Sequence, residues 1–195
     1  MIRSFRAAAT VVLVVSLTAV ACTSDGHNGD GSRAAEFVPL RKLREIAVSG
    51  DPLGELGADD PGARTRPVAE VRLGGDRLVA YVDPKACGLV VDAPGAGHFG
   101  LKTAWPKDDN DAGTDSLPGG PYAQSSSSGY ERRSAWVQLS CGGRAMIVRY
   151  EARGAHDVSG VRGAMSVVRS RTRNATLVVI GPKKLRSVIA RKLSA

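Results

Sequence analysis

The sequence has few of the residues on which most enzymes depend. It contains three histidines and three cysteines in 195 residues. It has no GxSxG nucleophile motif, no HExxH zinc-binding motif and no CxxC pair. Only His98 and His156 lie in the part of the chain that we expect to fold, and neither stands in a recognisable catalytic motif. We therefore predict no catalytic residue from sequence.

A hydrophobic run long enough to cross a membrane is also missing. The longest apolar stretch, residues 7–21, is shorter than the roughly 20 residues that a membrane helix needs. It follows two arginines, Arg3 and Arg6, and ends in small residues. A basic start, a short apolar core and small residues at the end are typical of a secretory signal peptide. We expect residues 1–21 to be removed and the remainder to be exported.

The end of this segment, Ala19-Val20-Ala21-Cys22, resembles the lipobox of bacterial lipoproteins, with Ala19 where that family prefers leucine. The resemblance implies that Cys22 is acylated and anchors the protein to the extracytoplasmic face of the cell membrane. The alternative is an ordinary signal-peptidase site, which the two alanines also fit. Residues 22–33 are polar and rich in Gly and Asp, which predicts a flexible tether.

Once Cys22 carries a lipid, Cys87 and Cys141 are the only cysteines left. Exported domains fold in an oxidising compartment, where two cysteines in one modest domain usually pair. We predict a Cys87–Cys141 disulfide. The alternative is a reactive thiol with His98 or His156 as its base, but neither cysteine lies in a nucleophile motif.

The chain is basic, with 27 Lys and Arg against 19 Asp and Glu and a net charge of +8. In a cytoplasmic protein this excess would suggest nucleic acid as a partner. For an exported protein we expect no nucleic acid, and the partners to consider are the membrane itself, an anionic envelope polymer or another envelope protein. The Gly- and Ala-rich composition is typical of a GC-rich genome. Such a genome favours arginine codons, which would explain many of the arginines without a functional role.

The rest of the chain, residues 34–195, is predicted to form a single α+β domain. Its mainly antiparallel sheet is expected to contain about five to seven short strands, flanked by an N-terminal and a C-terminal amphipathic helix. The strands are predicted at 68–73, 77–83, 87–92, 98–105, 134–141, 145–151 and 175–180.

Three segments carry the helix predictions. Residues 37–48 and the chain from Pro182 onwards both have apolar side chains at helical spacing. The second helix is basic, and we expect it to dock on the sheet; the alternative is a helix lying on a membrane. Residues 157–170 are predicted as a helix, although Gly160 and Gly163 disfavour one and a strand over 164–169 is the alternative.

Two short motifs resemble ligand sites only in part. Residues 95–100 match GxGxxG, but Trp105-Pro106 leaves no room for the helix that a dinucleotide site needs, so we expect a turn between strands. Residues 108–115 resemble a calcium loop, but Ala112 cannot bind the ion and Gly119 stands where the final glutamate belongs. The sequence therefore predicts no cofactor and no metal.

The most promising candidate site is a long segment, at about 105–133, that lacks hydrophobic periodicity. It is predicted to be a flexible loop, and loops of this length are uncommon unless they are functional or disordered. Trp105, Tyr122 and Tyr130 lie along it. Aromatic side chains on such loops often stack on sugar or peptide ligands, so we predict that these three bind a ligand. The alternative is a disordered insertion whose aromatics pack locally.

Together these features predict a membrane-anchored extracytoplasmic module that binds a ligand or partner at the cell envelope. Two alternatives stay open. One is a small envelope hydrolase that uses His98 or His156, and the other is a structural lipoprotein without a ligand.

Overall fold

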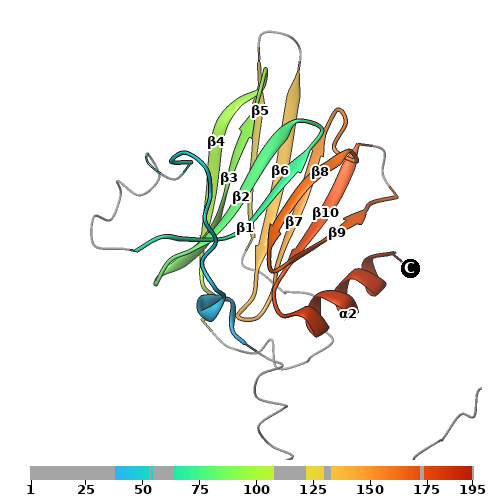
Figure 1. The fold of residues 1–195 in the computed structure, drawn as a ribbon. Coiled ribbons are helices and arrows are strands. Elements are labelled where there is room, and N and C mark those ends of the chain that lie inside the picture. The colour runs from blue at the N-terminus through green and yellow to red at the C-terminus, as the bar shows by residue number, and fades with distance from the viewer. Residues whose placement is uncertain are drawn as a thin grey trace, which may run out of the picture.

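The structure is a computed structural model that describes residues 38–52, 54, 64–107, 122–129, 133–171 and 174–194. Within them, two five-stranded sheets, in which every paired strand is antiparallel, form a β-sandwich (Figure 1). The predicted antiparallel character is confirmed, but the strands are more numerous than expected and the fold is mostly β. The predicted signal peptide, Cys22 and the predicted tether lie outside the described residues.

The two sheets are named A and B. Sheet A has the strand order β4-β3-β2-β1-β8, with bounds β1 Arg66–Leu73, β2 Asp76–Val82, β3 Ala86–Ala93, β4 Gly97–Ala104 and β8 Val158–Gly163. Sheet B has the order β5-β6-β7-β10-β9, with bounds β5 Tyr122–Ser128, β6 Ser134–Cys141, β7 Met146–Ala152, β9 Met165–Arg169 and β10 Ala175–Ile180.

The core lies between the two sheets. Inward-facing residues of the two sheets form one apolar cluster that includes Val71, Leu78, Leu89, Val137 and Val148. A cavity of about 10 Å³ inside this cluster is lined only by apolar side chains. It is about the size of one water molecule, so it is too small for an organic ligand.

The predicted disulfide is confirmed. Cys87 of β3 and Cys141 of β6 are bonded, with their Cα atoms 6.7 Å apart, and both are fully buried. Because β3 belongs to sheet A and β6 to sheet B, the bond joins the two sheets through the core.

A second link between the sheets is polar and centres on Asp76, at the start of β2. This carboxylate is fully buried and accepts a hydrogen bond from the Tyr150 hydroxyl of β7 at 2.6 Å. It also pairs with the Arg133 guanidinium at 2.5 Å, and Arg133 donates to the carbonyl oxygen of Pro94 at 2.7 Å. Burial, with Asp76 alongside, raises the pKa of Tyr150 well above its ordinary value.

The helix predicted over 157–170 is wrong. The segment is extended and passes from sheet A to sheet B between β8 and β9, which confirms the alternative of a strand in its second half. At the change of sheet, Gly163 has φ +86°, and a Cβ atom there would lie 2.2 Å from the carbonyl oxygen of Val68. Only glycine fits this corner, because a side chain would be both strained and blocked.

The N-terminal helix predicted over 37–48 is also wrong. The described part, from residue 38, contains only a 3-10 turn, η2, at Leu40–Lys42. Leu40 and Leu43 are buried in the core, and a single 3-10 turn places residues at this spacing on the same side. Beyond it, the amide of Ile46 donates to the carbonyl oxygen of Pro67 at 2.9 Å, so the chain runs extended beside the start of β1.

The C-terminal helix is confirmed as α2, Lys183–Ser194. The helix lies beside sheet B (Figure 1). Its Leu185 and Ile189 pack on Val168 and Val179, which lie on the outer face of that sheet. The helix therefore docks on the protein, and no helix among the described residues has the length and apolar character needed to cross a membrane. Its apolar contacts are with β7, β9 and β10, not with β5 or β6.

Candidate functional site

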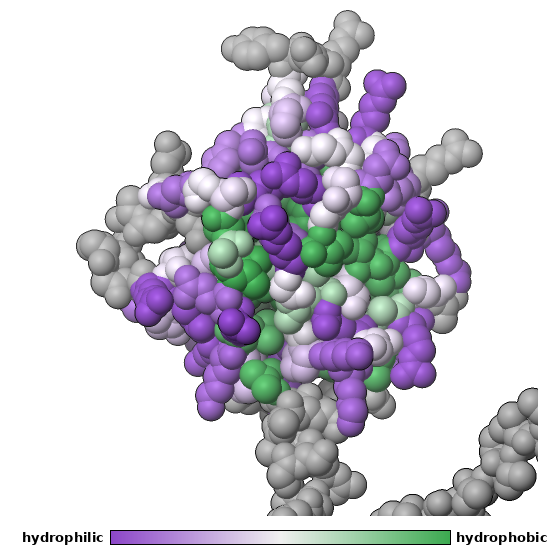
Figure 2. Space-filling model, in the orientation of Figure 1, coloured by the Kyte–Doolittle hydropathy of each residue, from purple (hydrophilic) through white to green (hydrophobic). Residues whose placement is uncertain are grey.

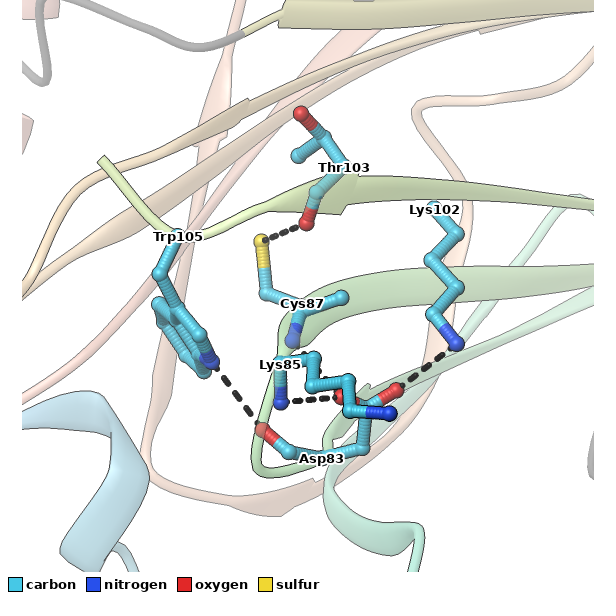
Figure 3. A network of polar contacts seen from close by, with 7 residues as sticks. Asp83, Lys85, Cys87, Lys102, Thr103 and Trp105 are labelled. Carbon is cyan, nitrogen blue, oxygen red and sulfur yellow. Dashed lines mark hydrogen bonds and ion pairs between the residues drawn. The ribbon is translucent and has the colours of Figure 1, made fainter. Parts of the chain in front are cut away.

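Trp105 lies in a polar network at one end of the sandwich, where β2 turns into β3 (Figure 3). The indole Nε1 donates to the carbonyl oxygen of Asp83 at 3.0 Å, and the guanidinium of Arg41 lies over the ring, 4.7 Å from its centre. The Asp83 carboxylate accepts hydrogen bonds from the amides of Lys85 and Ala86 at 2.7 and 2.6 Å.

Lys102 completes this network with an ion pair to Asp83 at 3.0 Å (Figure 3). Trp105 is 8% exposed, so most of its ring is covered by the protein. Its contacts hold the β2–β3 turn against the N-terminal segment. Because the ring is already covered by the protein, Trp105 is not part of the candidate ligand surface.

Of the other two aromatic residues of the predicted loop, Tyr122 and Tyr130, the structure describes only Tyr122. Tyr130 lies outside the described residues. Tyr122 is the first residue of β5 and is 59% exposed. The segment predicted as one flexible loop thus contains an edge strand of sheet B, and this strand presents Tyr122 at the surface.

The outer face of sheet B beside β5 carries a group of polar and aromatic side chains that we call the amide–aromatic face. In the strand register, Gln124 lies opposite Gln138 and Ser126 lies opposite Trp136. Residues directly opposite each other in an antiparallel pair point to the same face. The neighbours of Trp136 in β6 are buried, so the Trp136 side chain points outward. The face comprises Tyr122, Gln124, Ser126, Trp136, Gln138 and Arg149.

Arg149 of β7 contributes the positive charge of this face, and that charge is balanced. Its guanidinium pairs with Glu151 at 2.5 Å and lies 5.6 Å from the centre of the Trp136 ring. The Nε atom of Arg149 is buried and has no hydrogen-bond partner in the part of the chain that the structure describes. The amide–aromatic face is thus nearly neutral, yet rich in hydrogen-bonding groups.

Sequence reasoning did not identify Trp136 as a site residue. The signal was present, because the alternation Ala135-Trp136-Val137 places the tryptophan on the opposite side of the strand from two core residues. A tryptophan on the solvent side of a strand is a feature that a ligand surface would explain.

His156 lies in the β7–β8 loop, and its Nδ1 atom is 3.2 Å from the Thr176 hydroxyl. That hydroxyl donates its one proton to the carbonyl oxygen of Ala155 at 2.6 Å, so it accepts from the histidine. Thr176 is also fully buried. This geometry does not activate the threonine as a nucleophile, because the proton already has an acceptor and substrate cannot reach it.

His98 is exposed on β4, opposite Asp92 of β3 in the register. The GxGxxG residues that include it form the β3–β4 turn and the start of β4, as predicted. Within the described ranges, no three His, Cys, Asp or Glu side chains gather into a metal site. The calcium-like residues 108–115 lie outside those ranges.

Exposed apolar side chains also occur on β8, where Val158 and Val161 are 43% and 50% exposed. Figure 2 shows apolar side chains interspersed with hydrophilic ones on the visible face. Single exposed valines are ordinary on a protein surface and bring no chemistry of their own.

Comparison with known proteins assigns no family to this arrangement. No family model, no curated protein and no solved structure matches the chain. The functional conclusion therefore depends on the residues themselves.

Proposed function

We propose that the protein is a membrane-anchored binding module of the cell envelope. Residues 1–21 direct its export, an acylated Cys22 holds it on the extracytoplasmic face, and the amide–aromatic face binds an envelope polymer. A flexible tether over residues 22–33 would give the domain a reach of roughly 20 Å from the membrane.

The observation that carries this proposal is the half of sheet B that α2 does not contact. Helix α2 packs on β9 and β10, while β5 and β6 present an exposed tyrosine, a tryptophan and two glutamines. Outward-facing aromatics with neutral amides are suited to binding a ligand by stacking and hydrogen bonding. The internal cavity offers neither the space nor the polar groups for this role.

The proposal predicts that the protein sediments with purified cell-wall material from the producing bacterium, and that Trp136→Ala lowers the apparent affinity by about tenfold. The chain from residue 22 with Cys22→Ser should be used, because it carries no lipid and keeps every residue that the structure describes. Sedimentation is measured against wall concentration, with circular dichroism as the check of folding.

Val161→Ala is the matched control, because it removes an exposed apolar side chain from the other sheet and should leave binding unchanged. Equal binding by folded Trp136→Ala and the parent would contradict the assignment of the face. If the parent protein does not sediment with the wall at all, the alternative of a structural lipoprotein without a ligand is favoured instead.

A further inference from the structure

We infer that the ligand of the amide–aromatic face is a neutral, linear glycan whose sugar rings stack on Trp136 and Tyr122. This inference rests on the proposed function and adds the chemical class of the ligand. Three properties of the face support it: the spacing of the aromatic rings, the polar groups between them, and the charge.

The spacing of the two rings suits a chain rather than a single sugar. Tyr122 lies opposite Ser140, and Trp136 precedes Ser140 by four residues on the same strand. At the usual rise per residue and strand separation, the two Cα atoms are roughly 14 Å apart. One sugar ring cannot contact both positions, whereas a short run of linked sugars spans them.

The groups between the two rings suit hydroxyl-rich ligands. Gln124 and Gln138 face each other at the midpoint, and the Ser126 hydroxyl lies beside Trp136. Each carboxamide offers donors and an acceptor, and each hydroxyl offers both, so the face can pair with sugar hydroxyls in either direction.

The charge of the face argues against an anionic ligand. The chain as a whole has a net charge of +8, yet the cation of this face, Arg149, is paired with Glu151 at 2.5 Å. Recognition of phosphate or carboxylate usually employs arginine side chains that are open to bidentate contact. A neutral face on a basic protein therefore favours a neutral polymer over an acidic one.

Calorimetric titration tests this inference with neutral hexasaccharides of glucose, mannose, galactose and arabinose, the matching monosaccharides, and an oligogalacturonate of equal length. We expect at least one neutral hexasaccharide to bind at least tenfold more tightly than its monosaccharide, because it reaches both rings. Trp136→Ala and Tyr122→Ala should each weaken that binding by about tenfold, Trp136→Phe less, and Val161→Ala not at all.

Tighter binding of the oligogalacturonate, or binding of a monosaccharide equal to that of its hexasaccharide, would overturn the inference. So would the absence of neutral glycan binding by a protein that still sediments with wall through Trp136, and in that case the proposed function would survive. If wall binding itself does not depend on Trp136, the proposed function fails first.

Discussion

Replacing Cys87 and Cys141 together with alanine should lower the free energy of unfolding by about 4 kcal/mol. The two cysteines are 54 residues apart in the sequence, so their bond closes a long loop and restricts the unfolded chain. In the folded state the bond lies in the core and joins the two sheets, where it is protected from solvent.

Urea unfolding of the parent and the double variant, each with and without reductant, measures this effect. Reductant should lower the unfolding free energy of the parent most of the way to that of the double variant. It should leave the unfolding free energy of the double variant unchanged. The double substitution also removes two buried sulfur atoms from the core. Reductant controls for that loss, because it breaks the bond and leaves both sulfur atoms in place. A parent whose unfolding midpoint is the same in both conditions would contradict the assigned role.

The substitution Asp76→Ala should cost about 3 to 5 kcal/mol of folding stability. It removes the acceptor of the buried Tyr150 hydroxyl and the partner of the Arg133 guanidinium in one step. The buried Tyr150 hydroxyl would lose its acceptor, and leaving a buried polar group unpaired is costly. Arg133 would lose its ion-pair partner and keep only its hydrogen bonds to the carbonyl oxygens of Pro94 and Gly74. Chemical unfolding of the variant beside the parent measures the loss.

The pH dependence of stability tests the same network without disturbing Asp76. The folded state raises the pKa of Tyr150, so folding favours the neutral phenol. Its stabilising contribution is complete below the ordinary tyrosine pKa of about 10 and is lost as the pH rises above that value, because only the unfolded chain then ionises. Tyr150→Phe should weaken this alkaline loss. An equally steep loss in the parent and Tyr150→Phe would contradict the burial of the Tyr150 hydroxyl beside Asp76.

Much of the sandwich could be predicted from sequence, because its central strands combine apolar alternation with glycine turns. The hairpin of β6 and β7 around Gly142-Gly143 is an example, and β10 is apolar at every position except Thr176. One of the strands that sequence did not predict, β5, contains four consecutive serines at 125–128. Its pairing with β6 supplies the stability that its own composition lacks.

The helix errors have a different physical origin. Leu40 and Leu43 have a spacing that fits both a helix and a single 3-10 turn, and the choice is made by distant partners. The amide of Leu40 donates to the carbonyl oxygen of Gly143, and Arg66 donates to that of Leu43. Sequence patterns report local spacing, so they cannot reveal contacts made by the folded sandwich.

In the candidate site, too, sequence could identify only the features that do not depend on distant contacts. Tyr122 was identifiable as an exposed aromatic in a polar segment. The burial of Trp105 depends on Asp83 and Arg41, which are remote in sequence. Trp136 becomes a candidate only when the register of β5 and β6 places it on the same face as Tyr122 and two glutamines.

The central claim is that this module is exported and held at the membrane by Cys22. Intact-mass analysis of the native protein, extracted in detergent from membranes of the producing organism, tests it most directly. The account predicts the mass of residues 22–195 with a lipid adduct on Cys22 and a disulfide that opens with reductant. An unprocessed chain from Met1 in the cytosol, with all three thiols open to alkylation, would contradict it.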